Sequence, residues 1–150
     1  MTPSIEKVIA GMAEDILIIM QDILAANDLG DSNLTKELYT KYIEGGDNIM
    51  LNLFANHYIY WVDAGRKPTG NPPKEEWDDP IRSITDWCRR KGIPSDNATV
   101  HAIINKIHKY GYRGKFFLED FWIQAENTTY SNLDKLFDAI TAELTEWFEK

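Results

Sequence analysis

Apolar side chains recur every three or four residues along the first part of the chain, between residues 4 and 26. This spacing predicts an amphipathic helix, which Thr2 and Pro3 are well suited to begin. Residues 1–28 then form an N-terminal helical segment, and we expect its apolar face to pack against another surface of the protein. The apolar positions are Ile5, Val8, Ile9, Met12, Ile16, Ile19, Met20 and Ile23.

The pattern changes to alternation after residue 37. Segments 37–44 and 47–54 are typical of the two strands of a hairpin, and Gly45 with Gly46 supplies the positive φ angles of a two-residue turn. Residues 56–63 fit either a third strand or a short aromatic helix. The sequence therefore predicts at least one antiparallel strand pair.

Residues 63–80 are rich in proline and glycine, which excludes a regular helix. We expect an extended loop, and a loop of this length in a compact domain is usually functional or mobile. It fits two interpretations: an arm in polyproline II conformation that lies across a neighbouring molecule, or a plain linker.

Two helices joined by a short turn are expected after this loop. The first begins at Asp79-Pro80 and ends at Gly92, and the second covers residues 96–110 and ends at Gly111. Their apolar stripes are Ile81, Ile84, Trp87 and Cys88 on the first and Val100, Ile103, Ile104 and Ile107 on the second.

The last helix is expected at about 131–149, with Ser131 as its cap, whereas residues 112–128 fit no single element. The order of elements predicts a single domain, residues 1–150, of the α+β class. Its small antiparallel sheet is packed by long N- and C-terminal helices, and a central helix pair completes it. The apolar stripe of the last helix is Leu133, Leu136, Phe137, Ile140, Leu144, Trp147 and Phe148.

Composition places the chain among globular proteins. Its 150 residues make up about one domain, with 43% hydrophobic and 27% charged side chains. The single cysteine excludes an intramolecular disulfide. The longest strongly apolar run, residues 16–20, is too short to cross a bilayer, and it follows acidic residues where a signal peptide has basic ones. We therefore expect no membrane partner.

Charge is unevenly distributed along the chain, whose formal net charge is −8. Residues 81–115 hold eight basic and two acidic side chains, a net of +6, which leaves −14 on the other residues. Such a chain repels itself in like-to-like contacts and attracts in unlike ones, as head-to-tail assembly requires. The alternative is that the basic side chains simply lie on helix faces that are exposed to solvent, with no partner.

No catalytic or metal-binding motif stands out. Cys88 lies on an apolar stripe, as a buried structural cysteine does. His101 and His108 are seven residues apart, too far for one metal ion, and His57 beside aromatic residues fits a partly exposed histidine better than an acid–base group. The acidic cluster at 75–79 precedes a helix start, where the helix dipole favours it. We expect no enzyme, no metal and no cofactor.

The helix pair at residues 80–110 resembles a helix-turn-helix and carries the basic segment. A recognition helix needs long polar side chains in its first turn to reach base edges. This one begins with Asp96, whose charge opposes phosphate. A small DNA-binding regulator is therefore the alternative hypothesis for function.

The order of motifs between residues 31 and 120 resembles the tail-completion and head–tail connector (neck) proteins of tailed bacteriophages. Those chains share a tyrosine-rich stretch that ends in Gly-Arg-x-Pro, a Pro-rich loop, a helix with the pattern I-x-x-W-x-x-x-K-G-I, and an isoleucine-rich helix followed by glycine. The corresponding stretches here are Tyr58 to Pro68, Pro72-Pro73, Ile84 to Ile93 and His101 to Gly111, with Phe116-Phe117-Leu118 after them.

This resemblance implies a structural virion protein. Identical copies would form a ring in the phage neck or tail connector, join the portal or head to the tail, and continue the channel through which genomic DNA passes without sequence-specific binding. The protein would be made in the host bacterial cytoplasm and contact portal, connector or tail proteins. The residues expected at the assembly interface are Tyr58, Tyr60, Trp61, Asp63, Arg66, Lys67, Pro68, Pro72, Pro73, Arg89, Arg90 and Lys91.

Overall fold

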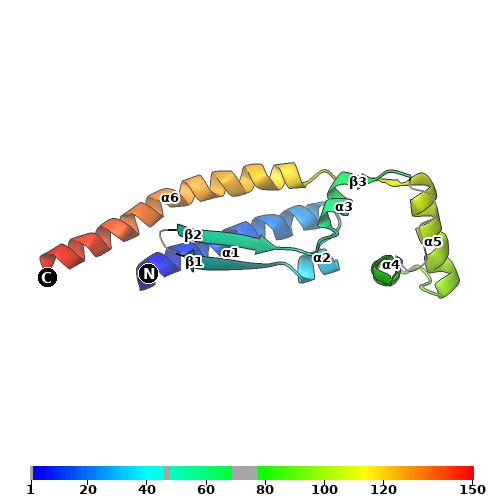
Figure 1. Ribbon diagram of the computed structural model, residues 1–150, viewed down its shortest axis with the longest axis horizontal. Helices are drawn as coiled ribbons and strands as arrows, with labels where there is room; N and C mark the ends of the chain where they lie inside the picture. The colour runs from blue at the N-terminus through cyan, green and yellow to red at the C-terminus, as the bar shows by residue number, and fades with distance from the viewer. Residues whose placement is uncertain (1, 46–47, 69–77) are drawn as a thin grey trace. The chain divides into compact units, whose positions relative to one another are not determined.

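The structure is a computed structural model that describes residues 2–45, 48–68 and 78–150 (Figure 1). It confirms the predicted α+β class. The chain divides into two compact units: a terminal unit, Met1–Asn56 with Phe117–Lys150, and a central unit, His57–Phe116. Each is described by itself below, and the expected single domain stays a prediction.

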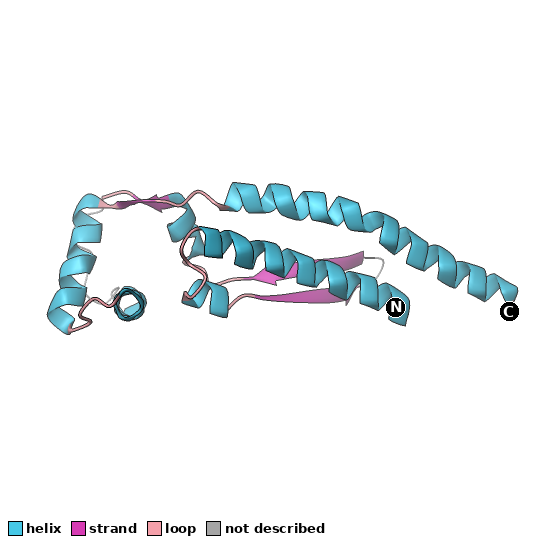
Figure 2. Cartoon of the chain, turned by 180° about the vertical axis from the view of Figure 1, so that it is seen from behind, coloured by secondary structure: helices cyan, strands magenta, loops and turns pink. Residues whose placement is uncertain are grey.

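The terminal unit is built around helix α1, Pro3–Ala26, which confirms the predicted N-terminal helix. Thr2 precedes it, and the Thr2 carbonyl accepts the Glu6 N–H at 2.9 Å. The helix ends where Asp28 adopts a positive φ of 63°. One face of α1 packs against helix α6, Leu118–Glu149, and another packs against the hairpin (Figure 2). The buried positions of α1 are Ile9, Ala13, Ile16, Met20, Ile23 and Leu24.

A hairpin of strands β1, Tyr39–Gly45, and β2, Asn48–Phe54, follows the short helix α2, Asn33–Lys36. The strands are antiparallel, as predicted. Gly45 was expected in the turn, but it is the last residue of β1 and pairs with Asn48; Gly46 lies outside the described residues. Extending the strand pairing through Gly45 satisfies more backbone groups than an earlier turn would.

The two faces of the hairpin differ in their surroundings. Register places one set of side chains toward α1, where the Tyr42 hydroxyl donates to Glu6 at 3.2 Å. The opposite set is exposed except for the half-buried Asn52, although it is largely apolar, and Tyr39 stacks on Phe54 with ring centroids 4.7 Å apart. We call this second set the outer hairpin face; its apolar members are Tyr39, Ile43, Met50 and Phe54.

Helix α6 begins at Leu118, so the prediction of a helix starting at Ser131 is wrong. Ser131, the expected cap, lies inside the helix, where its hydroxyl donates to the Thr128 carbonyl at 2.9 Å, as the nearby Thr129 hydroxyl does to the Ala125 carbonyl at 2.8 Å. Phe121 and Ala125 are buried, so the apolar period continues across the ambiguous segment. Tertiary packing therefore outweighs the weak propensity of Thr and Ser for helix.

The central unit begins with helix α3, Ile59–Ala64, which decides the ambiguous aromatic segment in favour of a helix. The expected loop at 63–80 is wrong at both of its ends. Gly65–Arg66 forms strand β3 against β4, Tyr112–Arg113, and helix α4, Asp78–Lys91, starts before residue 80. Residues 69–77, which include Pro72 and Pro73, lie outside the described residues.

The predicted helix pair is confirmed as α4 and α5, Asn97–Tyr110. Ile81 and Ile84 pack against the buried Val100 and Ile104. At the end of α4, Gly92 has a φ of 68°, and the next residue donates its N–H back to the Cys88 carbonyl at 2.9 Å. These are the features of a Schellman cap, which glycine favours.

The start of α5 is capped as the sequence indicates. The Asp96 carboxylate accepts the backbone N–H of Thr99 at 3.1 Å and its hydroxyl at 2.7 Å. These hydrogen bonds to the charged carboxylate lower the pKa of Asp96. Asp96 is therefore held as an anion in the first turn of α5.

Candidate functional site

Two segments of the central unit run side by side and hold most of the predicted interface residues. Strands β3 and β4 pair Gly65 with Arg113 and Arg66 with Tyr112. Beyond β4, the N–H groups of Lys115 and Phe116 donate to the carbonyls of Val62 and Asp63 at 2.9 and 3.0 Å. The end of α3 and the strand β3 that follows it are therefore hydrogen-bonded to residues 112–116.

Three glycines let these backbones approach closely. A Cβ on Gly111 would collide with the Arg66 carbonyl, and one on Gly114 would collide with the Asp63 carbonyl. Gly65 and Gly111 also have φ angles of 77° and 69°, which disfavour any other residue. The glycines thus fix which side chains of the two segments lie near each other.

Exposed aromatic side chains and cations alternate on these two segments. The Arg66 guanidinium lies 5.2 Å from the centroid of the Trp61 ring, and Arg113 lies 6.0 Å from that of Phe116. The side chain of Tyr60 is 68% exposed and that of Trp61 is 49% exposed. We call the following set the aromatic–cationic region: Tyr60, Trp61, Arg66, Lys109, Tyr110, Tyr112, Arg113 and Phe116.

Tyr112 links the two segments. Its hydroxyl donates to the Trp61 carbonyl at 3.0 Å, across 51 residues of sequence. Burial raises the pKa of Tyr112, and the positive charge of Arg66 acts in the opposite direction. The neutral phenol is therefore the form that the folded protein favours.

The charge of the region is positive. Residues 57–68 and 109–116 together hold five basic side chains and one acidic one. Cations above aromatic rings are attracted to the ring face, by about 0.5–1 kcal/mol where the pair is exposed. A surface of this composition is suited to bind an acidic partner that also offers aromatic or aliphatic groups.

The structure brings together only part of the predicted interface. Trp61, Asp63 and Arg66 meet at the β3–β4 pairing, and Lys67 and Pro68 continue from it as exposed residues. Tyr58 precedes α3 and is half-buried. Pro72 and Pro73 are outside the described residues.

The three basic residues at 89–91 lie on a different element, the last turn of α4. Arg90 pairs with Asp86 of the same helix at 3.3 Å, while Arg89 and Lys91 are exposed. Cations in the last turn stabilise a helix through its dipole. Their position therefore has a local explanation that requires no partner.

Sequence reasoning missed five residues of the region. Lys109 and Tyr110 lie at the end of the predicted helix 96–110, and Tyr112, Arg113 and Phe116 lie in the segment that fitted no single element. The signal was the alternation of aromatic and basic residues in Lys-Tyr-Gly-Tyr-Arg-Gly-Lys-Phe at 109–116.

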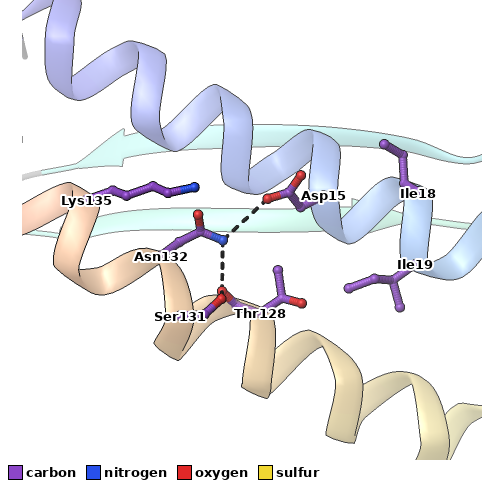
Figure 3. A pocket seen from close by; sticks show the side chains of 7 residues that line it. All are labelled: Asp15, Ile18, Ile19, Thr128, Ser131, Asn132 and Lys135. Atoms are coloured by element: carbon purple, nitrogen blue, oxygen red, sulfur yellow. Dashed lines mark hydrogen bonds between the residues drawn. The ribbon is translucent and has the colours of Figure 1, made fainter.

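A groove of about 380 Å³ lies in the terminal unit between α1 and α6 (Figure 3). The amide of the buried Asn132 crosses it and donates to the Asp15 carboxylate at 3.3 Å and to the Thr128 carbonyl at 2.9 Å. The first of these bonds joins α6 to α1, and the second lies within α6. The lining residues are Asp15, Ile18, Ile19, Thr128, Ser131, Asn132 and Lys135.

Within the described ranges, no group of three or more His, Cys, Asp or Glu side chains is arranged to hold a metal ion. None of the helices in the described part of the chain has the length and apolar character that a membrane span requires. Comparisons with known protein families, with curated proteins and with solved structures give no match.

Proposed function

We propose that the protein is a structural subunit of a ring in the neck or tail connector of a tailed bacteriophage. Identical copies dock head to tail, contact portal, connector or tail proteins, and surround the path of the genomic DNA. The proposal starts from the resemblance of residues 31–120 to that class of virion protein. It assigns the chain an assembly role and no reaction.

The observation that carries the proposal is the exposure of aromatic side chains at positions expected to mediate assembly. Tyr60 and Trp61 come from the motif that gives the resemblance; both are exposed, and Trp61 lies beside the Arg66 guanidinium. Clustered exposed aromatics are costly in an isolated protein, and Tyr, Trp and Arg are the residues that dominate protein–protein contacts. Their burial against a neighbouring copy would remove that cost.

Charge supports a contact between unlike surfaces. The terminal unit carries five basic and 17 acidic residues, and the central unit carries 11 basic and seven acidic, so their net charges are −12 and +4. Like units repel and unlike units attract. A ring uses a contact between two different patches of each copy, and this distribution favours such a contact. An acidic surface also repels DNA phosphates and suits the wall of a DNA channel.

The proposal is tested by assembly of the purified full chain. Sedimentation velocity over a range of concentrations gives the oligomeric state, and negative-stain imaging shows whether oligomers are closed rings. We expect rings, and we expect Tyr60→Ala to weaken them. Tyr130→Ala is the matched control, because Tyr130 is 64% exposed but lies on α6 outside the aromatic–cationic region. A wild-type chain that stays monomeric at every concentration contradicts the proposal.

A second measurement separates the ring subunit from a DNA-binding regulator. Fluorescence anisotropy with duplex DNA of varied sequence is recorded at increasing salt. We expect weak binding without sequence preference, since Asp96 places a carboxylate in the first turn of α5. Tight binding to one sequence, with a steep salt dependence, would favour the regulator instead.

A further inference from the structure

The C-terminal end of α6 extends beyond α1. The two helices are antiparallel, because Asn132 bonds to Asp15 and the Ser4 hydroxyl donates to Glu143. Each helix advances eleven residues between these two bonds. Residues 144–149 therefore continue for about 9 Å past the first turn of α1. Figure 1 shows this end of α6, in red, running past the N-terminus.

This end of α6 presents apolar side chains that nothing in the described structure covers. Trp147 and Phe148 are 70% and 75% exposed and meet edge to face, with ring centroids 4.9 Å apart. Leu144 is also exposed and lies three and four residues before them, on the same side of the helix. The sequence pattern placed all three on the apolar stripe of the last helix, and the structure shows that this end of the stripe is exposed.

The surroundings of these side chains are acidic. Helix α6 carries eight acidic residues and one lysine, and Glu143, Glu146 and Glu149 flank the apolar side chains. Lys150 pairs with Glu146 at 3.1 Å on the exposed surface, where such a pair contributes little. We call Leu144, Trp147 and Phe148 with these three glutamates the acidic aromatic end.

We propose that the acidic aromatic end of one copy docks on the aromatic–cationic region of the next copy. This inference rests on the proposed assembly of identical copies and names the two patches that meet. The receiving segments, residues 57–68 and 109–116, hold five basic residues and one acidic residue. Their net positive charge complements the glutamates of the incoming helix. Trp147 and Phe148 supply the large side chains that pair with Tyr60 and Trp61 in the centre of such a contact.

The outer hairpin face is the competing receiving surface. It is apolar and exposed, with Ile43 paired to Met50, but its charged member is a single residue, Lys41. It therefore offers the incoming glutamates far less charge complementarity than the aromatic–cationic region does. The test therefore includes one variant of each receiving surface.

Three double variants of the full chain test the contact. The first, Trp147→Ala/Phe148→Ala, removes the incoming group, and the second, Tyr60→Ala/Arg113→Glu, changes the receiving region. The third, Ile43→Ser/Met50→Ser, changes the outer hairpin face and serves as the control. All six side chains are exposed, so far-UV circular dichroism should show folded protein in each case. Sedimentation velocity then gives the dissociation constant of each variant alone and in mixtures.

We expect the first and second variants to associate about tenfold or more weakly than wild type, and the third to associate as wild type does. A mixture of the first two should form a 1:1 dimer, because each retains the patch that the other lacks. Suppose that wild type assembles. If the first or the second variant then assembles as well as wild type does, or if the third variant fails to assemble, the docking is overturned while the proposed ring stays in place. A monomeric wild type instead contradicts the proposed function itself.

Discussion

Asn132 is a buried polar residue in the contact between two long helices. Its amide donates to the Asp15 carboxylate and to the Thr128 carbonyl, so both hydrogens are satisfied. Such a residue fixes the register of a helix pair, because sliding either helix leaves a buried polar group without its partner. Asn132 therefore determines where the end of α6 lies relative to α1.

We expect Asn132→Ala to lower the free energy of unfolding by about 1–2 kcal/mol, because it removes both hydrogen bonds and leaves a gap in the contact. Urea unfolding followed by circular dichroism measures the change. Asn127→Ala is the matched control, since Asn127 is exposed on the same helix. Equal stabilities of the two variants would show that the Asn132 bonds contribute nothing.

Glycine substitutions should have opposite effects in the two units. Gly111 has a positive φ, and a Cβ there would meet the Arg66 carbonyl. Gly111→Ala should therefore cost about 2 kcal/mol or more of unfolding free energy. Gly11 lies inside α1 with open space around it, so Gly11→Ala should stabilise by up to about 1 kcal/mol. Urea denaturation of both variants checks the signs, and a tolerated Gly111→Ala would contradict the close β3–β4 approach.

Tyr112 should give the central unit a pH dependence in the alkaline range. Burial raises the pKa of Tyr112 in the folded protein above the ordinary value of about 10. Its contribution to stability is complete below the pKa of the unfolded chain and is lost as the pH rises through the higher folded pKa. Ultraviolet titration of tyrosinate should show a late-titrating group that Tyr112→Phe removes. A variant that loses only a normally titrating tyrosine and keeps the whole late-titrating part of the curve would contradict this assignment.

Helix α6 is continuous through Ser131, where the sequence pattern predicted the start of a helix. Tyr130 lies inside it and is exposed, so Tyr130→Ala should be nearly neutral. Tyr130→Pro removes a helix hydrogen bond and places a ring against the preceding turn, at a cost of about 3 kcal/mol. Unfolding free energies and the 222 nm ellipticity measure both variants. A proline that is tolerated as well as alanine would indicate a helix that starts after residue 130, as the sequence pattern predicted.

Elements with a clear period or a clear terminator were predictable from the sequence. Helix α1 follows its apolar spacing, and α4 and α5 end at Gly92 and Gly111, both with positive φ. The start of α6 was not predictable in this way, because Ser131 resembles a helix cap until its hydroxyl, like that of Thr129, is seen bonding to a carbonyl of the same helix. Local helix propensity predicts these residues poorly, because the packing of α6 against α1 decides that they are helical.

The candidate site was predictable only in its first half. The motif around Tyr60 and Trp61 singled out α3, but pairing of Arg66 with Tyr112 is a contact across 46 residues that no local pattern encodes. The exposure of Trp147 and Phe148 was likewise hidden, since an apolar stripe has the same spacing whether it faces a core or a partner. Burial is a property of the whole fold and of its neighbours.

The division of charge between the two units makes a prediction for the whole molecule. Because the terminal unit carries −12 and the central unit +4, attraction between unlike units of neighbouring copies should drive encounter and part of the affinity. Salt shortens the screening length from about 10 Å at 0.1 M to about 3 Å at 1 M, so assembly should weaken as salt rises.

Sedimentation velocity of the full chain at about 0.05, 0.15 and 0.5 M NaCl measures this dependence across the physiological range of ionic strength. Glu146→Gln/Glu149→Gln should flatten it, because both carboxylates belong to the acidic aromatic end and are exposed. Asp134→Gln/Asp138→Gln on the same helix removes equal charge outside that end and should leave the salt dependence steeper than the first pair does. Assembly that strengthens with salt would show that apolar burial alone drives it, with the charge division contributing only to solubility.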